Sequence, residues 1–377
     1  MNIAVNTRLL IENKLEGLGR FAHETLMRIA RNHPEHHFIF IFDRKYSDEF
    51  IYSNNITPVI AHPQARHPLL WYMFFEWGVP PVLNKHNAGL FLSPDGWLSL
   101  KTKVPSVPVI HDLNFFNNPE WIEWAPRNYY NFFFPKFIKK AERIVTVSNY
   151  SKHDIINRFP IPDNNIDVVY NGTSEGFSPI SEQQKKEIRK NYTAGEEFFL
   201  FVGLVHPRKN LERIIRAFDS FKFLTESRVK LLIIGSTKYM TADVQKAYHR
   251  SPNRADIIFT GYVSDAELKK ITASALALVY ASLFEGFGIP ILEAMHCDTP
   301  VITSSSSSMP EVGGNAVVYV DPYSVASISE AMRKVFTNTA FRQKIIEKAR
   351  AQRAHFSWDK TAGLLWESIE KVIATVK

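Results

Sequence analysis

The sequence predicts an α/β fold of two doubly wound parallel-sheet domains, and three observations support this. Short apolar runs typical of buried strands recur along the 377 residues. Segments with helical spacing lie between most of these runs, an alternation that indicates βαβ units. The alternation lapses once, near the middle of a chain that is too long for one ordinary domain. In such sheets, ligands bind beyond the carboxyl ends of the strands.

The first half opens with an apolar strand at residues 1–7, followed by a glycine-containing loop. The helix after this loop is predicted from the spacing of Phe21, Leu26 and Ile29. An aromatic-rich helical segment covers residues 128–143. The remaining strands of this half are predicted at 37–42, 90–93, 106–112 and 143–148.

Residues 171–195 are rich in Gly, Ser and charged residues and are predicted to be a hinge. We therefore expect one domain over 1–175 and a second over 176–357. Five consecutive serines at 304–308 follow an apolar run, so they are predicted to form a loop at the carboxyl end of a strand rather than a linker. The strands of the second half are predicted at 198–203, 229–235, 256–262, 275–282, 300–304 and 316–321.

Composition excludes several classes of protein. A net charge of +7 without a run of five like charges does not indicate nucleic-acid binding. Cys297 is the only cysteine, so no intrachain disulfide can form, which fits a reducing compartment. The N-terminal residues lack the pattern of a signal peptide, and no window is apolar enough to span a membrane. We expect a soluble, cytoplasmic protein.

Two acids flank a glycine-rich turn in FEGFGIPILE. Glu285 lies in the turn, and Glu293 is expected in the first turn of a helix that begins near Pro290. Gly286 and Gly288 allow close approach of the backbone to a ligand, and the helix N-terminus attracts anions. Such a corner suits phosphate or hydroxyl groups, because carboxylates accept hydrogen bonds from hydroxyls. The alternative is that one acid complements the helix dipole and the other is solvated.

This segment resembles the E-x7-E signature of retaining GT-B glycosyltransferases of family GT4, the glycosyl transferases of group 1. The resemblance covers almost the whole chain, since NTRLLIENKLEGLGRFAHE, VIHDL, RIVTVSNYSKHDI, FVGLVHPRKNLERIIRAF and SMPEVGGNAVVYVDP occur in the family's usual order. It implies two Rossmann-like domains that face a cleft, a nucleoside-diphosphate sugar donor, and transfer with retention of anomeric configuration. It also implies that the last helix, 358–377, packs back on the first domain.

By this resemblance, Glu293 binds the donor ribose and Glu285 binds hydroxyls of the transferred sugar. The backbone of Gly286, Phe287 and Gly288 reaches the sugar and the diphosphate.

Arg208 and Lys209 follow a predicted strand and precede a helix that starts near Asn210. Two cations at a helix N-terminus can neutralise the charge that grows on a leaving diphosphate. The alternative is a solvated pair in a turn. In the family such a pair can replace a divalent metal, and no Asp-x-Asp metal motif is evident, so we expect neither a metal nor a cofactor.

The family's remaining donor contacts fall on two loops. Gly17 and Gly19 are expected near the diphosphate and the acceptor, although their spacing alone predicts only a turn. The backbone of Tyr262 and Val263 is expected to contact the nucleobase.

His111 and Asp112 end a predicted strand. By resemblance, His111 binds sugar hydroxyls or polarises the reacting region by hydrogen bonds, and Asp112 orients it. Ser148 and Asn171 are secondary candidates, because a helix N-cap and a turn also explain them.

Residues 115–140 hold a cluster of aromatic side chains near Lys136, Lys139 and Lys140. Two interpretations stay open. The cluster is either a core element that also walls the acceptor site, or a membrane-surface patch. Pro126 and Pro135 are expected to interrupt a clean amphipathic helix, which favours the first interpretation.

Together these patterns predict a metal-independent retaining glycosyltransferase. The preferred donor is GDP-mannose, ahead of UDP-sugars, and the acceptor is a glycan or a lipid-linked sugar of a bacterial surface polysaccharide or glycolipid. A peripheral association with the inner face of the membrane is left open. The alternatives are a GT-B sugar-nucleotide epimerase and a non-catalytic nucleotide-sugar binding protein.

Overall fold

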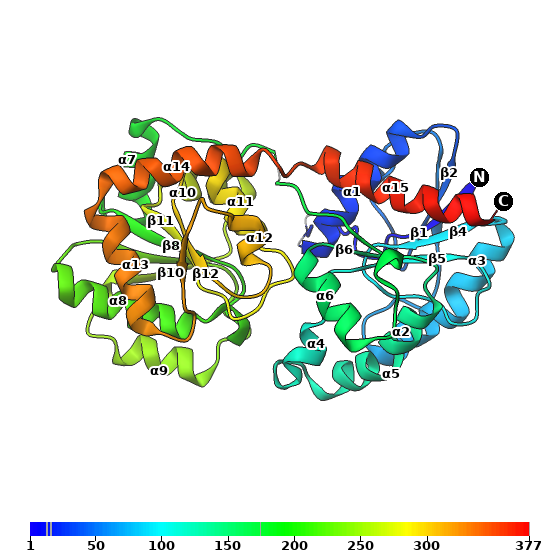
Figure 1. The fold of residues 1–377 in the computed structure, drawn as a ribbon, viewed down its shortest axis with the longest axis horizontal. Helices are drawn as coiled ribbons and strands as arrows, with labels where there is room; N and C mark the ends of the chain where they lie inside the picture. Colours follow the sequence, from blue (N-terminus) through cyan, green and yellow to red (C-terminus); the bar gives the residue numbers. More distant parts are fainter. Residues whose placement is uncertain (13, 16, 174, 377) are drawn as a thin grey trace. The chain divides into compact units, whose positions relative to one another are not determined.

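A computed structural model describes residues 1–12, 14–15, 17–173 and 175–376 of the chain. Its contacts divide the chain into two compact units. Unit 1 comprises Met1–Gly172 and Ser357–Lys377, and unit 2 comprises Thr173–Phe356. The expected limits, residues 175 and 357, lie three positions and one position further along the chain. Each unit is a parallel sheet covered by helices, as predicted (Figure 1).

Unit 1 contains a seven-stranded sheet with the order β3-β2-β1-β4-β5-β6-β7. Helices α1 and α15 contact each other, and α2 and α4 both contact α5 in a second group (Figure 1). The strands are β1 Asn2–Asn6, β2 His37–Phe42, β3 Ile56–Ile60, β4 Leu90–Ser93, β5 Ser106–Ile110, β6 Ile144–Thr146 and β7 Ile166–Val168. The helices are α1 Gly17–Asn32, α2 Pro68–Met73, the π-helix η2 Phe74–Gly78, α3 Val79–Lys85, α4 Asn114–Asn117, α5 Trp124–Lys140, α6 Asn149–Arg158 and α15 Trp358–Val376, with short 3-10 turns η1 Asp48–Phe50, η3 Pro119–Trp121 and η4 Asp163–Asn165.

Unit 2 contains a six-stranded sheet with the order β10-β9-β8-β11-β12-β13. Helix α8 contacts α9 and α13, while α11 contacts α10, α12 and α14. The strands are β8 Phe198–Val202, β9 Lys230–Ile234, β10 Ile257–Gly261, β11 Ala277–Tyr280, β12 Val301–Ser304 and β13 Val318–Val320. The helices are α7 Glu182–Thr193, α8 Leu211–Thr225, α9 Ala242–Arg250, α10 Asp265–Ser274, α11 Ile289–His296, α12 Met309–Gly313, α13 Val325–Thr337 and α14 Thr339–Arg353, with 3-10 turns η5 Pro207–Lys209 and η6 Arg254–Asp256.

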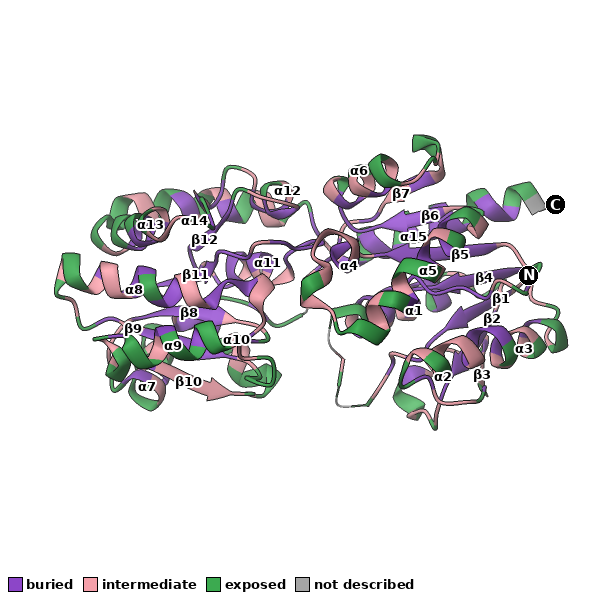
Figure 2. Ribbon diagram, turned by 90° about the horizontal axis from the view of Figure 1, so that it is seen from below, coloured by how far each residue is buried: buried purple, intermediate pink, exposed green. Residues whose placement is uncertain are grey.

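The central strands of both sheets are buried, because helices cover both faces of each sheet (Figure 2). In unit 2, for example, Leu231, Ile233 and Val279 are fully buried. Such near-continuous apolar strands are typical of parallel sheets and explain why the eleven predicted strands recur in the structure.

Three local predictions were wrong or incomplete. The expected hinge at 171–195 contains helix α7, which the apolar pattern of the sequence conceals because the helix is polar. Its capping box of Ser181 and Gln184 was a signal that could have predicted it. Strands β3 and β7 were not predicted, and both are edge strands, where Pro58 of β3 is tolerated. Helix α5 continues through Pro126 and Pro135; burial of Phe134 and Phe137 offsets the lost backbone bond.

Helix α15 returns the chain to unit 1, where it contacts α1. Arg28 of α1 pairs with Asp359 at 2.6 Å, and Lys371 pairs with Asp167 at 2.9 Å. A Cβ atom at Gly172 would lie 2.3 Å from the backbone nitrogen of Trp358. Glycine is therefore required where the two segments that connect the units pass each other.

Candidate active site

The strand order of unit 2 places two predicted motifs side by side. Strands β8 and β11 are adjacent and parallel, and the order of the sheet reverses between them. The loop after β8 carries Arg208 and Lys209, and the loop after β11 carries Glu285. The carboxyl ends of strands at such a reversal are the usual binding position in doubly wound sheets.

Arg208, Lys209 and Glu285 form one ionic cluster. The Lys209 ammonium donates to Glu285 Oε1 at 2.7 Å and to the Tyr280 hydroxyl at 2.6 Å. Arg208 Nη1 is paired with Glu285 Oε2 and donates to the carbonyl of Phe284 at 3.2 Å. The Glu285 carboxylate thus anchors both cations, and its expected contact with sugar hydroxyls stays a prediction.

The charge states of this cluster follow from its surroundings. Burial raises the pKa of Glu285, but the charges of Arg208 and Lys209 more than offset this and lower it to about 2. Burial, with the charge of Glu285, raises the pKa of Tyr280 well above its ordinary value. At neutral pH the cluster therefore holds an ionised Glu285 and a neutral Tyr280.

Asn210 fixes the loop that carries the two cations. Its amide nitrogen donates to the carbonyl of Ala281 at 2.9 Å and to that of Pro322 at 2.6 Å. The side chain is buried, and the backbone has the left-handed conformation with φ of +60°. Asparagine suits this position because it tolerates that conformation and joins the loop to two neighbouring ones.

The serine loop, residues 304–308, holds the loop of Glu285 in place. The Ser308 hydroxyl donates to the carbonyls of Glu285 and Phe287, each at 2.9 Å. Ser307 Oγ accepts from the backbone N–H of Glu285 at 3.1 Å, and Ser304 donates to the carbonyl of Ser282. The serines lie at the carboxyl end of β12, as predicted. Their hydrogen bonds to the loop of Glu285 were not predicted.

Helix α11 begins at Ile289, directly after the buried Gly286, Phe287 and Gly288. Gly288 has φ of +109°, a conformation that glycine adopts readily. Glu293 is partly exposed and is the fifth residue of the helix, so the expectation that it lies in the first turn was wrong. The charge of Glu293 contributes to the raised pKa of Tyr280, which places it near the cluster.

Tyr262 and Val263 follow β10 and precede α10. They lie at the same edge of the sheet as the cluster, but β10 is separated from β8 by β9. The side chain of Tyr262 is 78% exposed.

In unit 1, His111 follows β5 and bonds to the loop after β4. Its Nε2 lies 2.9 Å from the carbonyl of Pro94, so Nε2 carries a proton. Burial lowers the pKa of His111, so at neutral pH the ring is neutral and Nδ1 has an acceptor lone pair. The orienting group is thus Pro94, whereas Asp112 accepts the backbone N–H of Asn114 at 2.9 Å.

The other predicted residues of unit 1 lie at the start of α1, at the start of α6 and after β7. Gly17 is the first residue of α1 and Gly19 lies in its first turn; Phe21 of this helix meets the His111 ring edge-on at 4.9 Å. Ser148 is the N-cap of α6 and accepts from the backbone of Ser151 at 3.1 Å. Asn171 is buried, and its Oδ1 has no hydrogen-bond partner among the described residues.

A polar group in unit 1 was missed. Arg8 pairs with Asp95 at 2.6 Å, and Asn6 donates to the same carboxylate at 2.8 Å. Arg8 lies in the loop after β1 and Asp95 in the loop after β4, and the order of this sheet reverses between these two strands. The signal was in the sequence, since the polar residues of NTR and SPD lie at the carboxyl ends of two predicted strands.

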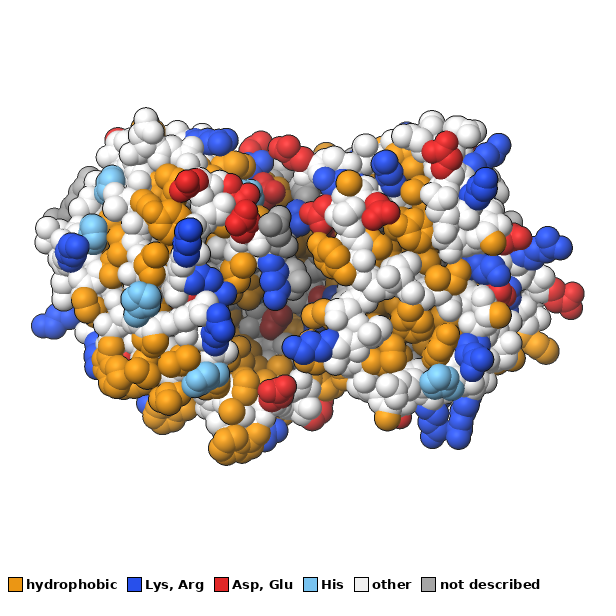
Figure 3. Space-filling view, turned by 180° about the vertical axis from the view of Figure 1, so that it is seen from behind, with side chains coloured by type: hydrophobic (Ala, Val, Ile, Leu, Met, Phe, Trp, Pro, Cys, Tyr) orange, Lys and Arg blue, Asp and Glu red, His pale blue; other side chains and the backbone are white. Residues whose placement is uncertain are grey.

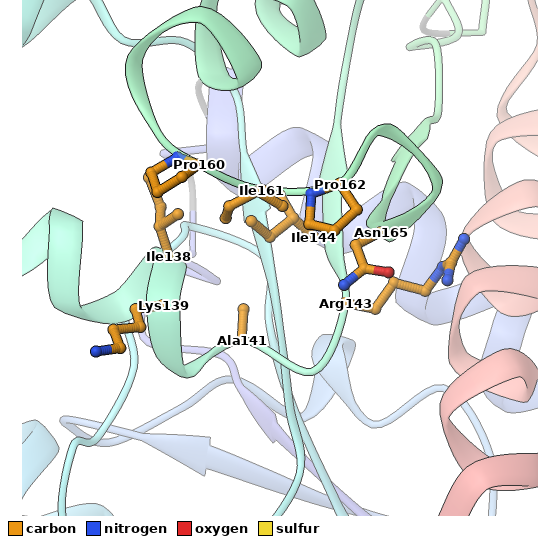
Figure 4. Close-up of a pocket in the computed structure, with 9 residues that line it drawn as sticks. All are labelled: Ile138, Lys139, Ala141, Arg143, Ile144, Pro160, Ile161, Pro162 and Asn165. Atoms are coloured by element: carbon orange, nitrogen blue, oxygen red, sulfur yellow. The ribbon is translucent and has the colours of Figure 1, made fainter.

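A cavity of about 180 Å³ lies elsewhere in unit 1, between the end of α5 and residues 160–165 (Figure 4). Ile138, Ile144 and Ile161 supply much of its lining, and none of the predicted site residues borders it. Within the described part of the chain, there is no group of three or more His, Cys, Asp or Glu residues that could hold a metal ion. The described helices include none long and apolar enough to cross a membrane.

Comparison with known proteins identifies the family. Residues 183–352 match Glycosyl transferases group 1, and residues 15–175 match Glycosyltransferase Family 4. The chain is 30% identical to O-antigen chain mannosyltransferase B of Escherichia coli, over 93% of this chain and 94% of that one. It is 29% identical to O-antigen chain mannosyltransferase RfbU of Salmonella typhimurium, over 74% of each.

The fold is also that of solved glycosyltransferases. Sucrose-phosphate synthase from Thermosynechococcus elongatus superposes with a TM-score of 0.78 at 16% identity, over 99% of both chains. The GT-B fold predicted from the sequence is therefore confirmed. The chain belongs to the group 1 glycosyl transferases of family 4 and is a hexosyltransferase.

Proposed function

We propose that the protein transfers mannose from GDP-mannose to a hydroxyl of a glycan or lipid-linked acceptor in the synthesis of a bacterial surface polysaccharide, with retention of anomeric configuration. The observation that carries the proposal is the cluster of Arg208 and Lys209 on Glu285, at the reversal of the unit 2 sheet. Two relatives that match most of the chain are named as mannosyltransferases, which favours mannose over other hexoses.

In the proposed reaction, the bond between sugar C1 and the diphosphate oxygen breaks, and the acceptor oxygen bonds to C1 on the same face. The acceptor proton passes to the leaving phosphate oxygen. Arg208 and Lys209 neutralise the departing diphosphate, and preorganised charges act most strongly on charge that develops in the transition state. Glu285 fixes the two cations.

The other predicted residues position the substrates. Glu293 binds the ribose, and the backbone from Gly286 to Gly288 approaches the sugar. Tyr262 and Val263 contact the base. The acceptor lone pair of neutral His111 takes a hydrogen bond from a sugar hydroxyl. The proposed reaction uses no metal ion.

The test is a transfer assay with GDP-mannose, GDP-glucose, UDP-glucose and UDP-N-acetylglucosamine, using a membrane extract or a synthetic mannosyl lipid as acceptor. The proposal predicts transfer from GDP-mannose, an α-linked product by NMR, and activity that survives EDTA. Transfer only from a UDP-sugar would contradict the donor. Conversion of a sugar nucleotide without acceptor would indicate an epimerase, and binding without turnover would indicate a sensor.

A further inference from the structure

A groove of about 410 Å³ lies at one edge of the unit 2 sheet. Its walls come from the edge strand β13, the end of α13 and the first part of α14. Apolar surface in the groove is supplied by Val317, Val318, Phe341 and Ile345. Small-molecule sites are typically clefts of about 300–1,000 Å³ with a mostly apolar lining and a few polar groups. The size and lining of this groove fit that description.

Three lysines border the apolar surface. Lys334, in the last turn of α13, has its Nζ 4.1 Å from the centre of the Phe341 ring. Lys344 and Lys348 are one turn apart on α14, and both line the groove. Like charges at this spacing destabilise a helix. The stability of α14 therefore does not explain this pair of lysines.

The charges of the lysines are not neutralised by acids of the protein. Basic and acidic side chains are mixed over much of the face of unit 2 seen in Figure 3, and Arg350 of α14 pairs with Asp298 at 2.5 Å. Of the described residues that line the groove, by contrast, three are lysines and none is acidic. Glu330 pairs with Arg333 at 2.8 Å, and Glu347 does not border the groove. The groove is thus complementary to an anion.

The edge of the sheet adds a backbone donor. The carbonyl of Val320 accepts the N–H of Ser305 at 3.1 Å, so the backbone of Val320 faces β12. Successive residues of a strand present their backbone groups to opposite sides. The N–H and carbonyl of Tyr319 therefore face away from β12, and Tyr319 lines the groove.

We propose that this groove binds a small organic phosphate that carries an apolar or aromatic part. A phosphate monoester holds about two negative charges at neutral pH, which Lys344 and Lys348 match, while Lys334 stays over the Phe341 ring. Phosphate oxygens also accept hydrogen bonds from backbone N–H groups, and the apolar part packs against Ile345. Walls from one strand and two helices favour such a compact ligand over an extended acidic peptide.

The site is separate from the proposed donor site. None of the residues proposed to contact the nucleotide sugar borders the groove. The groove adjoins the last turn of α13 and the residues just before β13, whereas Arg208, Lys209 and Glu285 lie at the carboxyl ends of β8 and β11.

The test uses pyridoxal 5′-phosphate as the probe, because it combines an aromatic ring, a phosphate and an aldehyde. The aldehyde condenses with a lysine amine to give an imine and water, and borohydride reduces the imine to a stable amine. Peptide mapping by mass spectrometry then identifies the labelled lysine. At equimolar probe and full chain, we expect Lys344 or Lys348 to be labelled about tenfold or more above Lys246, an exposed lysine of α9. Pyridoxine 5′-phosphate, which lacks the aldehyde, should suppress this labelling, whereas pyridoxine should not.

Variants test the two lysines without the covalent step. In titration calorimetry with pyridoxine 5′-phosphate, K344Q with K348Q should raise Kd about tenfold or more. The matched control is K186Q with K190Q, two exposed lysines at the same spacing on α7, which should leave Kd unchanged. K209M alters the donor cluster and should leave labelling in the groove intact, whatever the transfer assay shows. Circular dichroism checks that each variant folds.

Three results would overturn the proposal. The label could spread evenly over exposed lysines, K344Q with K348Q could bind as tightly as the wild-type chain, or pyridoxine could compete as well as its phosphate. Suppression of labelling by polyglutamate but not by pyridoxine 5′-phosphate would also overturn it, because the groove would then bind an acidic peptide.

Discussion

At the scale of single residues, the site depends on one carboxylate that holds two cations. Lys209 is 8% exposed and donates both to Glu285 and to Tyr280. A buried ammonium needs such partners, because an unpaired buried charge is strongly destabilising. Arg208 is held by Glu285 and by a backbone carbonyl. The sequence predicted all three charged groups but not their arrangement, since nothing in the local pattern shows that Glu285 faces the cations. Tyr280 was missed because a strand residue between apolar neighbours has the pattern of a core residue.

The first prediction concerns the carboxylate. E285Q keeps the shape of the side chain but removes the charge that fixes Arg208 and Lys209. We expect kcat to fall about 100-fold or more, with a loss of unfolding free energy of about 3 kcal/mol. E212Q is the control, because Glu212 pairs with Arg216 on the surface of α8. Unchanged turnover in E285Q would refute the role of Glu285.

Tyr280 provides the second prediction. Y280F removes one acceptor of Lys209 without changing the packing, so the net loss is that of about one hydrogen bond, 1–2 kcal/mol. If Tyr280 positions Lys209 for the leaving group, kcat should fall about tenfold while KM for the donor changes little. A loss of thermal stability with unaltered kcat would instead mean that Tyr280 is purely structural.

At the scale of elements, loops form the site, and one polar helix could not be predicted from the apolar pattern. The serine loop makes hydrogen bonds to both sides of Glu285 and to Phe287. The sequence shows only that five serines follow a predicted strand. Serine hydroxyls can bond to any loop, so the order of the strands in the sheet is needed to identify the loop of Glu285 as their partner. Helix α7 was missed for the opposite reason. Only Ile188 and Thr193 of its twelve residues are buried, so the apolar periodicity that predicts a helix is almost absent.

The third prediction tests the serine loop. S308A leaves the carbonyls of Glu285 and Phe287 without this donor and should lower the unfolding free energy by about 1–3 kcal/mol. It should also reduce activity, because the loop of Glu285 loosens. S305A is the matched control, since Ser305 is exposed and should be neutral. Equal behaviour of S308A and S305A in thermal unfolding and transfer assays would show that Ser308 does not hold the loop of Glu285.

At the scale of the whole molecule, the two units repeat one arrangement. In each sheet, an arginine in the loop after the first strand pairs with an acid in the loop after the strand at which the order reverses: Arg8 with Asp95 in unit 1, and Arg208 with Glu285 in unit 2. Strand alternation predicted the two sheets because buried parallel strands are almost uniformly apolar. The edge strands β3 and β7 lack this uniformly apolar pattern, because β3 contains Pro58 and β7 has only three residues.

The fourth prediction concerns pH. The pKa of Glu285 is lowered from 4.5 to about 2, so its contribution to stability is complete above pH 4.5 and is lost as pH falls towards 2. By linkage this amounts to on the order of 3 kcal/mol. The unfolding midpoint of the wild-type chain should therefore drop more steeply between pH 5 and 3 than that of E285Q. Parallel pH profiles would show that Glu285 is not ion-paired in solution.

Titration calorimetry with GDP and GMP tests whether Arg208 and Lys209 bind the diphosphate of a nucleotide sugar. We expect the wild-type chain to bind GDP about tenfold or more tightly than GMP, because the second phosphate reaches the cations. R208M and K209M should each reduce this preference while K334M, on α13, leaves it intact. An equal preference for GDP in the wild-type chain, R208M and K209M would show that these two cations do not bind the diphosphate.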